Sequence, residues 1–284
     1  MQEYRDMTST YFIRGLKYAI SLLFKLLILF ILAYPFLWVV LTAFKPYKET
    51  VTYPPSFLPS VWTMDGFRQC AQTIDVFHFL KNTLVVSFSV LLAQYLVIIP
   101  AAYSFARVKF AGKTILFGVV LLGFMIPQQI TFVPVYLMFS KAKLLSSYWP
   151  QILPFVGNAF GIFLLRQYFM QIPEEIIEAA RMDDAGEFKI IVSIMIPMAK
   201  TALFAIGLLS FISMWNSYFW PLIMTTNDTY RPLTIAVASM KTVDGAVLWN
   251  MLMAANLFLI GPILLAYLLA SKQIRSAFVY SGIK

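Results

Sequence analysis

Residues 82–106 read NTLVVSFSVLLAQYLVIIPAAYSFA, a run of 25 positions without an Asp, Glu, Lys or Arg. An α-helix rises about 1.5 Å per residue, so this run would cover roughly 37 Å as a helix, more than the hydrocarbon core of a bilayer at about 30 Å. A run this long and apolar predicts a transmembrane helix.

Five further runs of 19 to 27 positions also lack these charged residues: 26–44, 114–140, 144–165, 201–227 and 245–271. The whole chain is 60% hydrophobic and 12% charged, with a mean hydropathy of +0.77, whereas a soluble domain is roughly 25% charged. Six such helices in a soluble protein would leave too little polar sequence to cover them. We therefore expect an all-α integral membrane protein with six transmembrane helices.

The distribution of Lys and Arg predicts the orientation. With both termini in the cytoplasm, the cytoplasmic segments hold 14 of the 22 cations, as the positive-inside rule favours. No small-residue cleavage site follows the first apolar run, so we expect a retained helix instead of a signal peptide. The expected organisation is a cytoplasmic segment 1–25, a first transmembrane helix 26–44, an extracytoplasmic loop 45–80 with a short helix, a membrane domain 80–271 with a cytoplasmic loop 166–200, and a cytoplasmic tail 272–284.

Several function classes are excluded by what the spans lack. The six runs contain no ionisable residue for a proton or sodium relay, and the one histidine, His78, lies at an outer boundary. The nearest approach to a nucleotide-binding loop, residues 111–114, has Arg107 where the first glycine is required. The single cysteine, Cys70, excludes an intrachain disulfide and a multi-cysteine metal site. The cations do not cluster on a polar face, so nucleic acid is not an expected partner, and we expect neither an enzyme active site nor a bound cofactor or metal.

The loop between the fourth and fifth runs is predicted to form two short helices. Pro173, followed by Glu174 and Glu175, is typical of a helix start, because the missing N–H would be unpaired there and carboxylates favour the positive end of the helix dipole. A turn is expected at 183–186, and a second helix is expected to begin near Glu187 and to stop before Pro197. Such a compact element at the membrane surface can be gripped by another protein.

The spacing in this loop resembles a known motif. Glu178-Ala179-Ala180 is followed by three residues, then Asp184, then nine residues, then Ile194-Met195-Ile196-Pro197. This is similar to the EAA loop of bacterial ABC importer permeases, whose pattern is E-A-A, three residues, G, nine residues and I-x-L-P. Asp184 stands where the motif has glycine and Ile196 where it has leucine. Aspartate tolerates the left-handed conformation better than most residues, so we expect the turn to be kept.

Other segments extend the resemblance over nearly the whole chain and narrow it to the carbohydrate-uptake, maltose-importer-like branch. They are Asn82–Ser87, Ala102–Arg107 with Phe110 and Gly112-Lys113, Ile126-Pro127, Trp215–Leu222 and the terminal Ser281–Lys284. The resemblance implies a type I importer permease fold and a non-catalytic transport subunit. It also implies a second permease, two ABC ATPase subunits that use ATP and Mg²⁺, and an extracytoplasmic solute-binding protein.

The resemblance also assigns roles within the loop. It implies that the ATPase is contacted by Glu178, Ala179, Ala180, Asp183, Asp184, Gly186, Ile194 and Pro197. Glu178 would anchor the loop through a charge-assisted contact with a cation on the ATPase. The alternative for Glu178 is an ordinary solvated glutamate, and for the two alanines it is plain helix propensity.

Aromatic residues make up 17% of the chain, and their faces can stack on sugar rings. Candidates for lining a sugar path are Tyr95, Tyr136, Trp215, Asn216 and Tyr218. The alternative is that aromatic side chains form interfacial belts or face lipid. A monosaccharide, an oligosaccharide, a polyol or a glycerol-phosphate-like compound would all fit the sequence, and a stand-alone secondary carrier for a neutral solute and a structural scaffold are the alternative functions.

Overall fold

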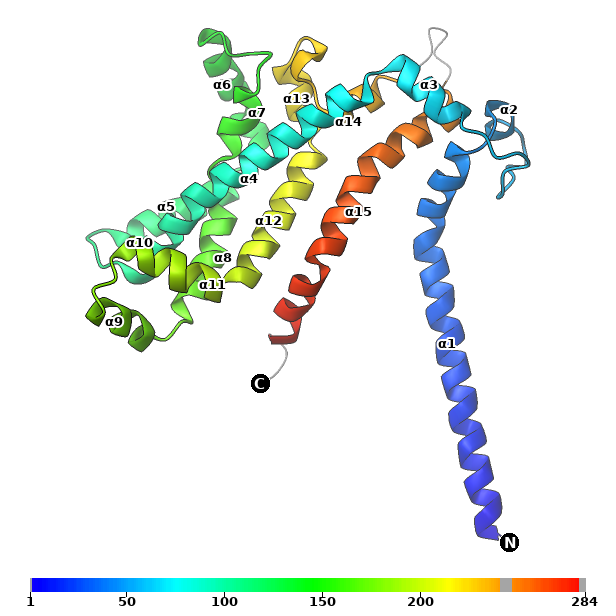
Figure 1. The fold of residues 1–284 in the computed structure, drawn as a ribbon, viewed down its shortest axis with the longest axis horizontal. Helices are drawn as coiled ribbons and strands as arrows, with labels where there is room; N and C mark the ends of the chain where they lie inside the picture. Colours follow the sequence, from blue (N-terminus) through cyan, green and yellow to red (C-terminus); the bar gives the residue numbers. More distant parts are fainter. Residues whose placement is uncertain (1, 241–246, 281–284) are drawn as a thin grey trace. The chain divides into compact units, whose positions relative to one another are not determined.

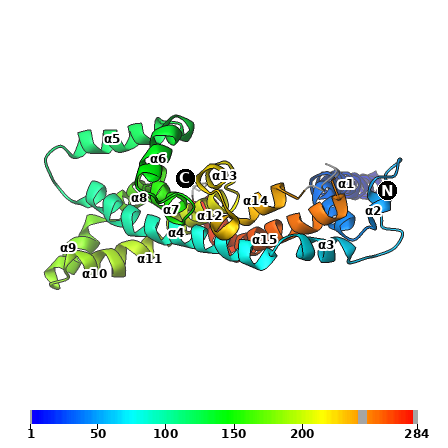
Figure 2. The ribbon, with the colours of Figure 1, turned by 90° about the horizontal axis from the view of Figure 1, so that it is seen from above.

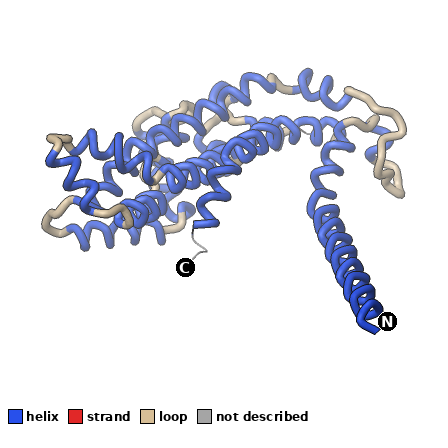
Figure 3. The backbone as a smooth tube through the Cα atoms, turned by 60° about the horizontal axis from the view of Figure 1, so that its bottom comes forward, coloured by secondary structure: helices blue, strands red, loops and turns tan. Residues whose placement is uncertain are grey.

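The structure, a computed structural model, describes residues 2–240 and 247–280, and its regular elements are all helices (Figure 3). Predictions for residues 1, 245, 246 and 281–284 lie outside this described part. Four helices are long and apolar enough to cross a membrane: Leu16–Ala43, Val76–Arg107, Trp149–Met170 and Trp249–Leu269. Two bent pairs, Lys113–Met125 with Gln128–Lys141 and Glu187–Met198 with Lys200–Trp215, raise the number to six if each pair is one span. The expectation of an all-helical membrane protein is confirmed.

The chain divides into two compact units, of which the first holds residues 1–73 and 241–257. Its described helices are α1 (Gln2–Ala43), α2 (Tyr47–Thr50), α3 (Asp65–Thr73) and the beginning of α15 (Trp249–Tyr280). Two short helices therefore occupy the segment 45–80, where the sequence predicted one. Gly66 allows α3 to approach the beginning of α15 closely, because a Cβ atom at this position would lie 2.6 Å from the carbonyl oxygen of Asn250.

A buried lysine organises the end of α1. Lys45 is 2% exposed, its ammonium group donates a hydrogen bond to the carbonyl of Ser56, and it lies 4.8 Å from the centroid of the Trp38 ring. A buried cation is costly unless it is paired or hydrogen-bonded, so these contacts fix the chain as it leaves the helix.

The second unit holds residues 74–240 and 258–284 and is built around α4 (Val76–Arg107). This 32-residue helix packs against α8 (Ala159–Met170) and α12 (Lys200–Trp215) (Figures 1 and 2). The three helices enclose an apolar core whose fully buried members include Ile98, Leu165 and Ile206. Burying these side chains fixes α4 against both neighbours.

The third expected span, 114–140, is two helices. α5 (Lys113–Met125) and α6 (Gln128–Lys141) meet at an angle of 95°. The break falls at Ile126-Pro127, because proline has no N–H to continue the helix and restricts the preceding residue to extended conformations. Ile126 has φ −80° and ψ 117°, as this restriction requires.

The fourth and fifth spans also differ from the charge-free runs. The fourth was expected at 144–165 but is formed by α7 (Trp149–Ile152), the 3-10 helix η1 (Leu153–Phe155) and α8, which reaches Met170. The fifth was expected as 201–227, but α12 ends at Trp215 and α13 (Phe219–Met224) follows after a break. The absence of charged residues indicates that a segment lies at membrane depth, but it does not indicate whether the segment is one continuous helix. The predicted bounds of both spans were wrong for this reason. The 3-10 helix η3 (Asp228–Tyr230) and α14 (Leu233–Ala238) come next.

Candidate functional site

Residues 173–198, which we call the coupling loop, form a helical hairpin. α9 (Glu174–Met182) begins directly after Pro173, as predicted, and α10 (Glu187–Ile190) begins at the predicted residue. The prediction that the second helix stops before Pro197 is wrong. It continues through the π-helical η2 (Ile191–Met195) and α11 (Ile196–Met198). A proline ring normally collides with the carbonyl four residues earlier, and the wider π-helical turn displaces that carbonyl.

The turn of the hairpin is a Schellman motif. Asp184 has a φ of 54°, in the left-handed region, so the aspartate takes the conformation expected of it in place of glycine. The N–H of Asp184 donates to the carbonyl of Arg181 at 3.1 Å, and the N–H of Ala185 donates to the carbonyl of Ala180 at 3.0 Å. The next residue, Gly186, is extended with φ −66°, a conformation open to any residue.

Most of the predicted ATPase-contacting residues are accessible. Glu178, Ala179, Asp183, Asp184, Gly186 and Pro197 are exposed, and Ala180 and Ile194 are half-buried. Within the described part of the chain, the Glu178 carboxylate makes no hydrogen bond or ion pair. Met182 and Phe188 flank the turn with exposed fractions of 86% and 81%. The hairpin thus presents an unpaired carboxylate beside apolar side chains, which is a surface suited to a protein partner.

The hairpin is held to the last turn of α4. Arg107 donates hydrogen bonds to the Glu174 carboxylate and to the carbonyls of Phe169 and Ile172. The Arg107 side chain is 9% exposed, so these three acceptors compensate a largely buried charge.

A second contact reaches the other arm of the hairpin. The Tyr103 hydroxyl donates to the carboxylate of Glu187, which also accepts from Arg181 at 3.0 Å. The hydrogen bond with Glu187 raises the pKa of the Arg181 guanidinium. Sequence reasoning quoted Tyr103 only as part of the resemblance and gave it no role.

A polar pocket lies among α4, α5, α6, η1, α8 and α12. Its volume is about 360 Å³, and its lining residues with polar side chains are Gln94, Gln128, Asn158, Ser210 and Ser213. The amide of Gln94, which is 5% exposed, donates to the carbonyl of Phe155 at 2.7 Å and accepts a hydrogen bond from the Ser210 hydroxyl. The rings of Phe124 and Phe160 stack at the wall, with centroids 6.0 Å apart.

A second cavity of about 190 Å³ adjoins the polar pocket. It shares Gln128, Phe155, Ser213 and Met214 with the first and adds Ser217 and Tyr218. Among the described residues that line the two cavities, none is charged. Amides, hydroxyls and aromatic faces are the groups that bind the edges and faces of neutral hydroxylated solutes.

The five aromatic and amide path candidates occupy different places. Tyr218 lines the second cavity, and Asn216 is exposed, with its amide donating to the carbonyl of Ile212 at 3.0 Å. Tyr136 is half-buried against a core cluster that includes Phe155.

The other two candidates lie in helix contacts. The Tyr95 hydroxyl donates to the carbonyl of Leu203 at 2.8 Å, and the fully buried Trp215 donates to the carbonyl of Leu259 at 2.9 Å. Neither is among the lining residues of the two cavities. Sequence reasoning missed Gln94, Gln128 and Asn158, although an amide inside a charge-free span is itself a readable signal.

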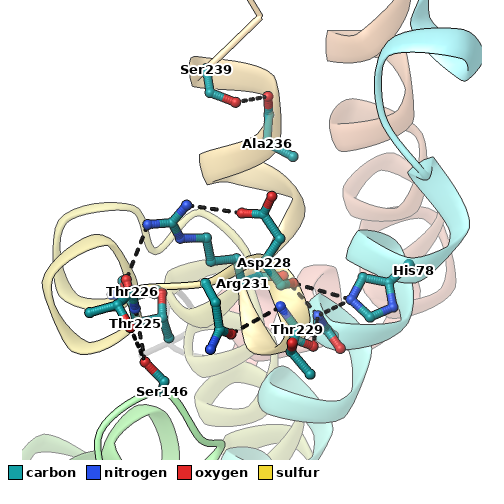
Figure 4. Close-up of polar contacts among 12 residues, drawn as sticks. His78, Ser146, Thr225, Thr226, Asp228, Thr229, Arg231, Ala236 and Ser239 are labelled. Carbon is teal, nitrogen blue, oxygen red and sulfur yellow. Dashed lines mark hydrogen bonds and ion pairs between the residues drawn. The ribbon is translucent and has the colours of Figure 1, made fainter.

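The opposite end of α4 holds the loop that leads to α14, and Figure 4 shows part of this contact. The Asn82 amide donates to the carbonyls of Thr229 and Arg231 at 3.0 and 2.9 Å. Nε2 of His78 lies 3.1 Å from the Asp228 carbonyl, and Arg231 pairs with the Asp228 carboxylate at 2.9 Å (Figure 4). Within the described residues no three His, Cys, Asp or Glu side chains gather as a metal site would require.

Residues 94–274 match the family described as binding-protein-dependent transport system inner membrane component. The chain belongs to this family. It is therefore a multi-pass subunit of the cytoplasmic membrane and a non-catalytic transport component, and the resemblance to ABC importer permeases is confirmed. The family has no known cofactor of its own.

Two relatives are permease proteins UgpE of the sn-glycerol-3-phosphate transport system. The protein from Yersinia pestis bv. Antiqua (strain Antiqua) is 33% identical over 192 residues, which cover 67% of this chain and 68% of that protein. The protein from Escherichia coli O1:K1 is 28% identical over 236 residues, covering 80% and 84%. A crystal structure of a bacterial ABC transporter involved in the import of the acidic polysaccharide alginate matches with a TM-score of 0.80 and 22% identity, covering 89% of this chain and 95% of that one. This structural likeness shows the shared fold.

Proposed function

We propose that this chain is one of two permease subunits of an ATP-driven importer whose solute is a neutral sugar or oligosaccharide. The uncharged lining of the two cavities supports this solute class, because a site for an anion would be expected to offer Lys or Arg. The relatives named for sn-glycerol 3-phosphate and for the acidic polysaccharide alginate act on charged compounds. We therefore expect the solute of this chain to differ from theirs in charge.

The remaining subunits are a second permease, two ABC ATPases that use ATP and Mg²⁺, and an extracytoplasmic solute-binding protein. Both termini lie in the cytoplasm, with 1–25 and 272–284 as cytoplasmic segments and 45–80 as the extracytoplasmic loop. This orientation places the Arg107 end of α4 and the coupling loop on the cytoplasmic side. The excess of Lys and Arg in the cytoplasmic segments supports it.

The coupling loop docks on one ATPase, with Glu178 paired to a cation there and Met182 and Phe188 covered by the partner. The lack of an ionic partner for Glu178 within the described chain supports this role. ATP binding closes the ATPase pair and carries the loop with it, and the membrane helices then change between inward-open and outward-open states.

Affinity purification in mild detergent tests the coupling. The wild type is expected to retain the ATPase and the second permease. The Glu178→Lys variant is expected to retain at least about tenfold less ATPase than the wild type, because the lysine places a like charge against the cation on the ATPase. Asp65→Lys, an equal charge change in α3, serves as the control. ATPase retained by Glu178→Lys at the wild-type level would contradict the docking role.

The solute class is tested with the whole complex, including its binding protein, in proteoliposomes. We expect ATP-dependent uptake of maltotriose and none of glycerol 3-phosphate. The reverse preference would overturn the neutral class while leaving the permease assignment intact. Uptake without ATP would instead favour the alternative of a stand-alone secondary carrier.

A further inference from the structure

The last turn of α4 faces the coupling loop with two side chains that lie on one side of the helix. Tyr103 and Arg107 are four residues apart, so they lie one above the other. Tyr103 is 2% exposed as a residue, and the Arg107 side chain is 9% exposed. Side chains buried this deeply have few alternative conformations, so their polar ends are fixed in direction.

These two side chains hold different parts of the hairpin. Arg107 binds the first residue of α9 through the carboxylate of Glu174, and it also binds the carbonyls of Phe169 and Ile172, which directly precede the hairpin. Tyr103 binds the start of its second arm, through Glu187.

Glu187 closes the hairpin as well. It accepts hydrogen bonds from Nε and Nη2 of Arg181 at 3.2 and 3.0 Å, which join the first residue of α10 to the last turn of α9. Because both arms are joined to each other and each arm has one charge-assisted hydrogen bond with α4, the hairpin cannot rotate away from α4 without breaking the Arg107–Glu174 and Tyr103–Glu187 contacts.

The same helix carries the wall of the polar pocket. Gln94 precedes Tyr103 by nine residues, about 14 Å along the helix axis. It lines the pocket and is hydrogen-bonded to Phe155 and to Ser210 of α12. Between these points α4 stays helical through Pro100, where one backbone hydrogen bond is missing, and it is held straight by packing against α8 and α12. A displacement of its Arg107 end is therefore transmitted to the pocket wall.

We propose that Tyr103 and Arg107 are positioning residues that make α4 move with the coupling loop, so that closure of the ATPases changes the exposure of the polar pocket. This inference rests on the proposed function, because only a loop held by an ATPase has a movement to transmit. Neither residue touches solute or nucleotide in this role.

A thiol reporter in the pocket tests the inference without knowledge of the solute. Ser213 lines both cavities, and Ser213→Cys preserves the size of the side chain. The native Cys70 is fully buried, and burial raises the pKa of its thiol to about 11, so it should react slowly. The whole complex without Ser213→Cys gives the labelling background. The measurement is the rate of labelling by a membrane-impermeant maleimide added from the outside, with and without a non-hydrolysable ATP analogue.

The test variants are Tyr103→Phe, which removes one hydroxyl and keeps the buried ring, and Arg107→Gln. The matched controls are Tyr168→Phe, whose hydroxyl has no hydrogen bond among the described residues, and Arg68→Gln at an exposed position of α3. Retention of the ATPase and the rate of ATP hydrolysis are measured on the same preparations.

We expect the nucleotide to raise labelling in the reporter chain and in both controls. In Tyr103→Phe and Arg107→Gln the nucleotide-dependent increase in the labelling rate should be about tenfold smaller, which is the effect of losing a hydrogen bond to a charged group. The ATPase should stay bound and active in both variants. A nucleotide response equal to that of the controls would overturn the inference. Loss of the bound ATPase in both variants would overturn it too, since the two residues would then shape the docking surface. A wild-type complex without an ATPase would instead show that the proposed function has failed.

Discussion

The two ends of α4 are held by different chemistry. At one end Asn82, which is 1% exposed, binds two carbonyls and accepts a hydrogen bond from the Tyr148 hydroxyl at 2.6 Å. At the other end Arg107 and Tyr103 bind carboxylates of Glu174 and Glu187, whose side chains are 49% and 54% exposed.

Buried neutral hydrogen bonds are insensitive to salt and pH, whereas contacts with half-exposed charges are weakened by both. The buried contacts of Asn82 with the carbonyls of Thr229 and Arg231 and with the Tyr148 hydroxyl are therefore built as a fixed anchor, beside the half-buried His78 ring. The Arg107 end is built from contacts that its surroundings can modify, which suits the end that we propose to lie next to the ATPases.

The largest effect is expected from breaking the anchor. Asn82→Leu leaves the carbonyls of Thr229 and Arg231 without their donor and the Tyr148 hydroxyl without its acceptor. We expect a loss of about 3 kcal/mol in the free energy of unfolding, at roughly 1 kcal/mol for each lost hydrogen bond. Denaturant unfolding in detergent measures it. Asn216→Leu, at an exposed position, should change the same quantity by less than about 0.5 kcal/mol; equal losses in the two variants would contradict the anchor.

A smaller and salt-dependent effect is expected at the Arg107 end. Arg107→Gln removes the ion pair with Glu174 and hydrogen bonds to two carbonyls. We expect the free energy of unfolding to fall by about 2 kcal/mol at low salt. The lost ion pair accounts for less than about 1 kcal/mol of this decrease, because Glu174 is half-exposed. Repeating the unfolding at 1 M NaCl should reduce the loss, while the loss in Asn82→Leu stays constant. If the decrease in the free energy of unfolding caused by Arg107→Gln did not depend on salt, the two ends of α4 would not differ in the way that we propose.

The smallest effect is a pH dependence that separates a carboxylate from a neutral hydroxyl as the group that holds a loop. Glu49 accepts hydrogen bonds from the hydroxyl of Ser56 at 2.6 Å and from the N–H and hydroxyl of Ser60. The bond from Ser56 is the largest cause that lowers the pKa of Glu49. A lowered pKa in the folded chain means that the carboxylate stabilises the loop above its unfolded pKa of about 4.3 and that this stabilisation is lost as the pH falls through the folded value.

Hydrogen exchange measures this loss at individual amides. The amide of Ser60 should exchange faster below about pH 4, after correction for the intrinsic rate, whereas the amide of Leu233, which donates to Thr83 at 2.9 Å, should keep its protection. Glu49→Gln should remove the pH dependence. If the protection of Ser60 shows the same pH dependence in the wild type and in Glu49→Gln, the carboxylate does not hold this loop.

The coupling loop was the part of the site most accessible to sequence reasoning. Pro173 and the two glutamates marked the start of α9, and Asp184 adopted the left-handed conformation that its side chain tolerates. Both depend on interactions between residues close together in the chain. The roles proposed for Glu178 and its neighbours depend on a second protein and stay predictions.

The polar pocket was not predicted, because its members come from distant parts of the chain. Gln94 and Ser210 are 116 residues apart and meet only because α4 packs against α12. The path candidates were chosen for being aromatic, and Trp215 is instead a fully buried helix contact. The type of a residue does not by itself indicate whether its side chain faces a cavity or a neighbouring helix.

The sequence is enough to predict a helical protein that lies in a membrane, because the free energy of inserting a segment depends on the local run of apolar residues. It also determined the shape of the hairpin, through capping and turn chemistry within a few residues. The contacts of Tyr103 and Arg107 with that hairpin, the anchoring of the opposite end of α4 by Asn82, and the uncharged amides in the pocket are seen only in the folded chain. These contacts join residues far apart in the chain, so the packing of whole helices selects them from many pairings that the sequence leaves equally open.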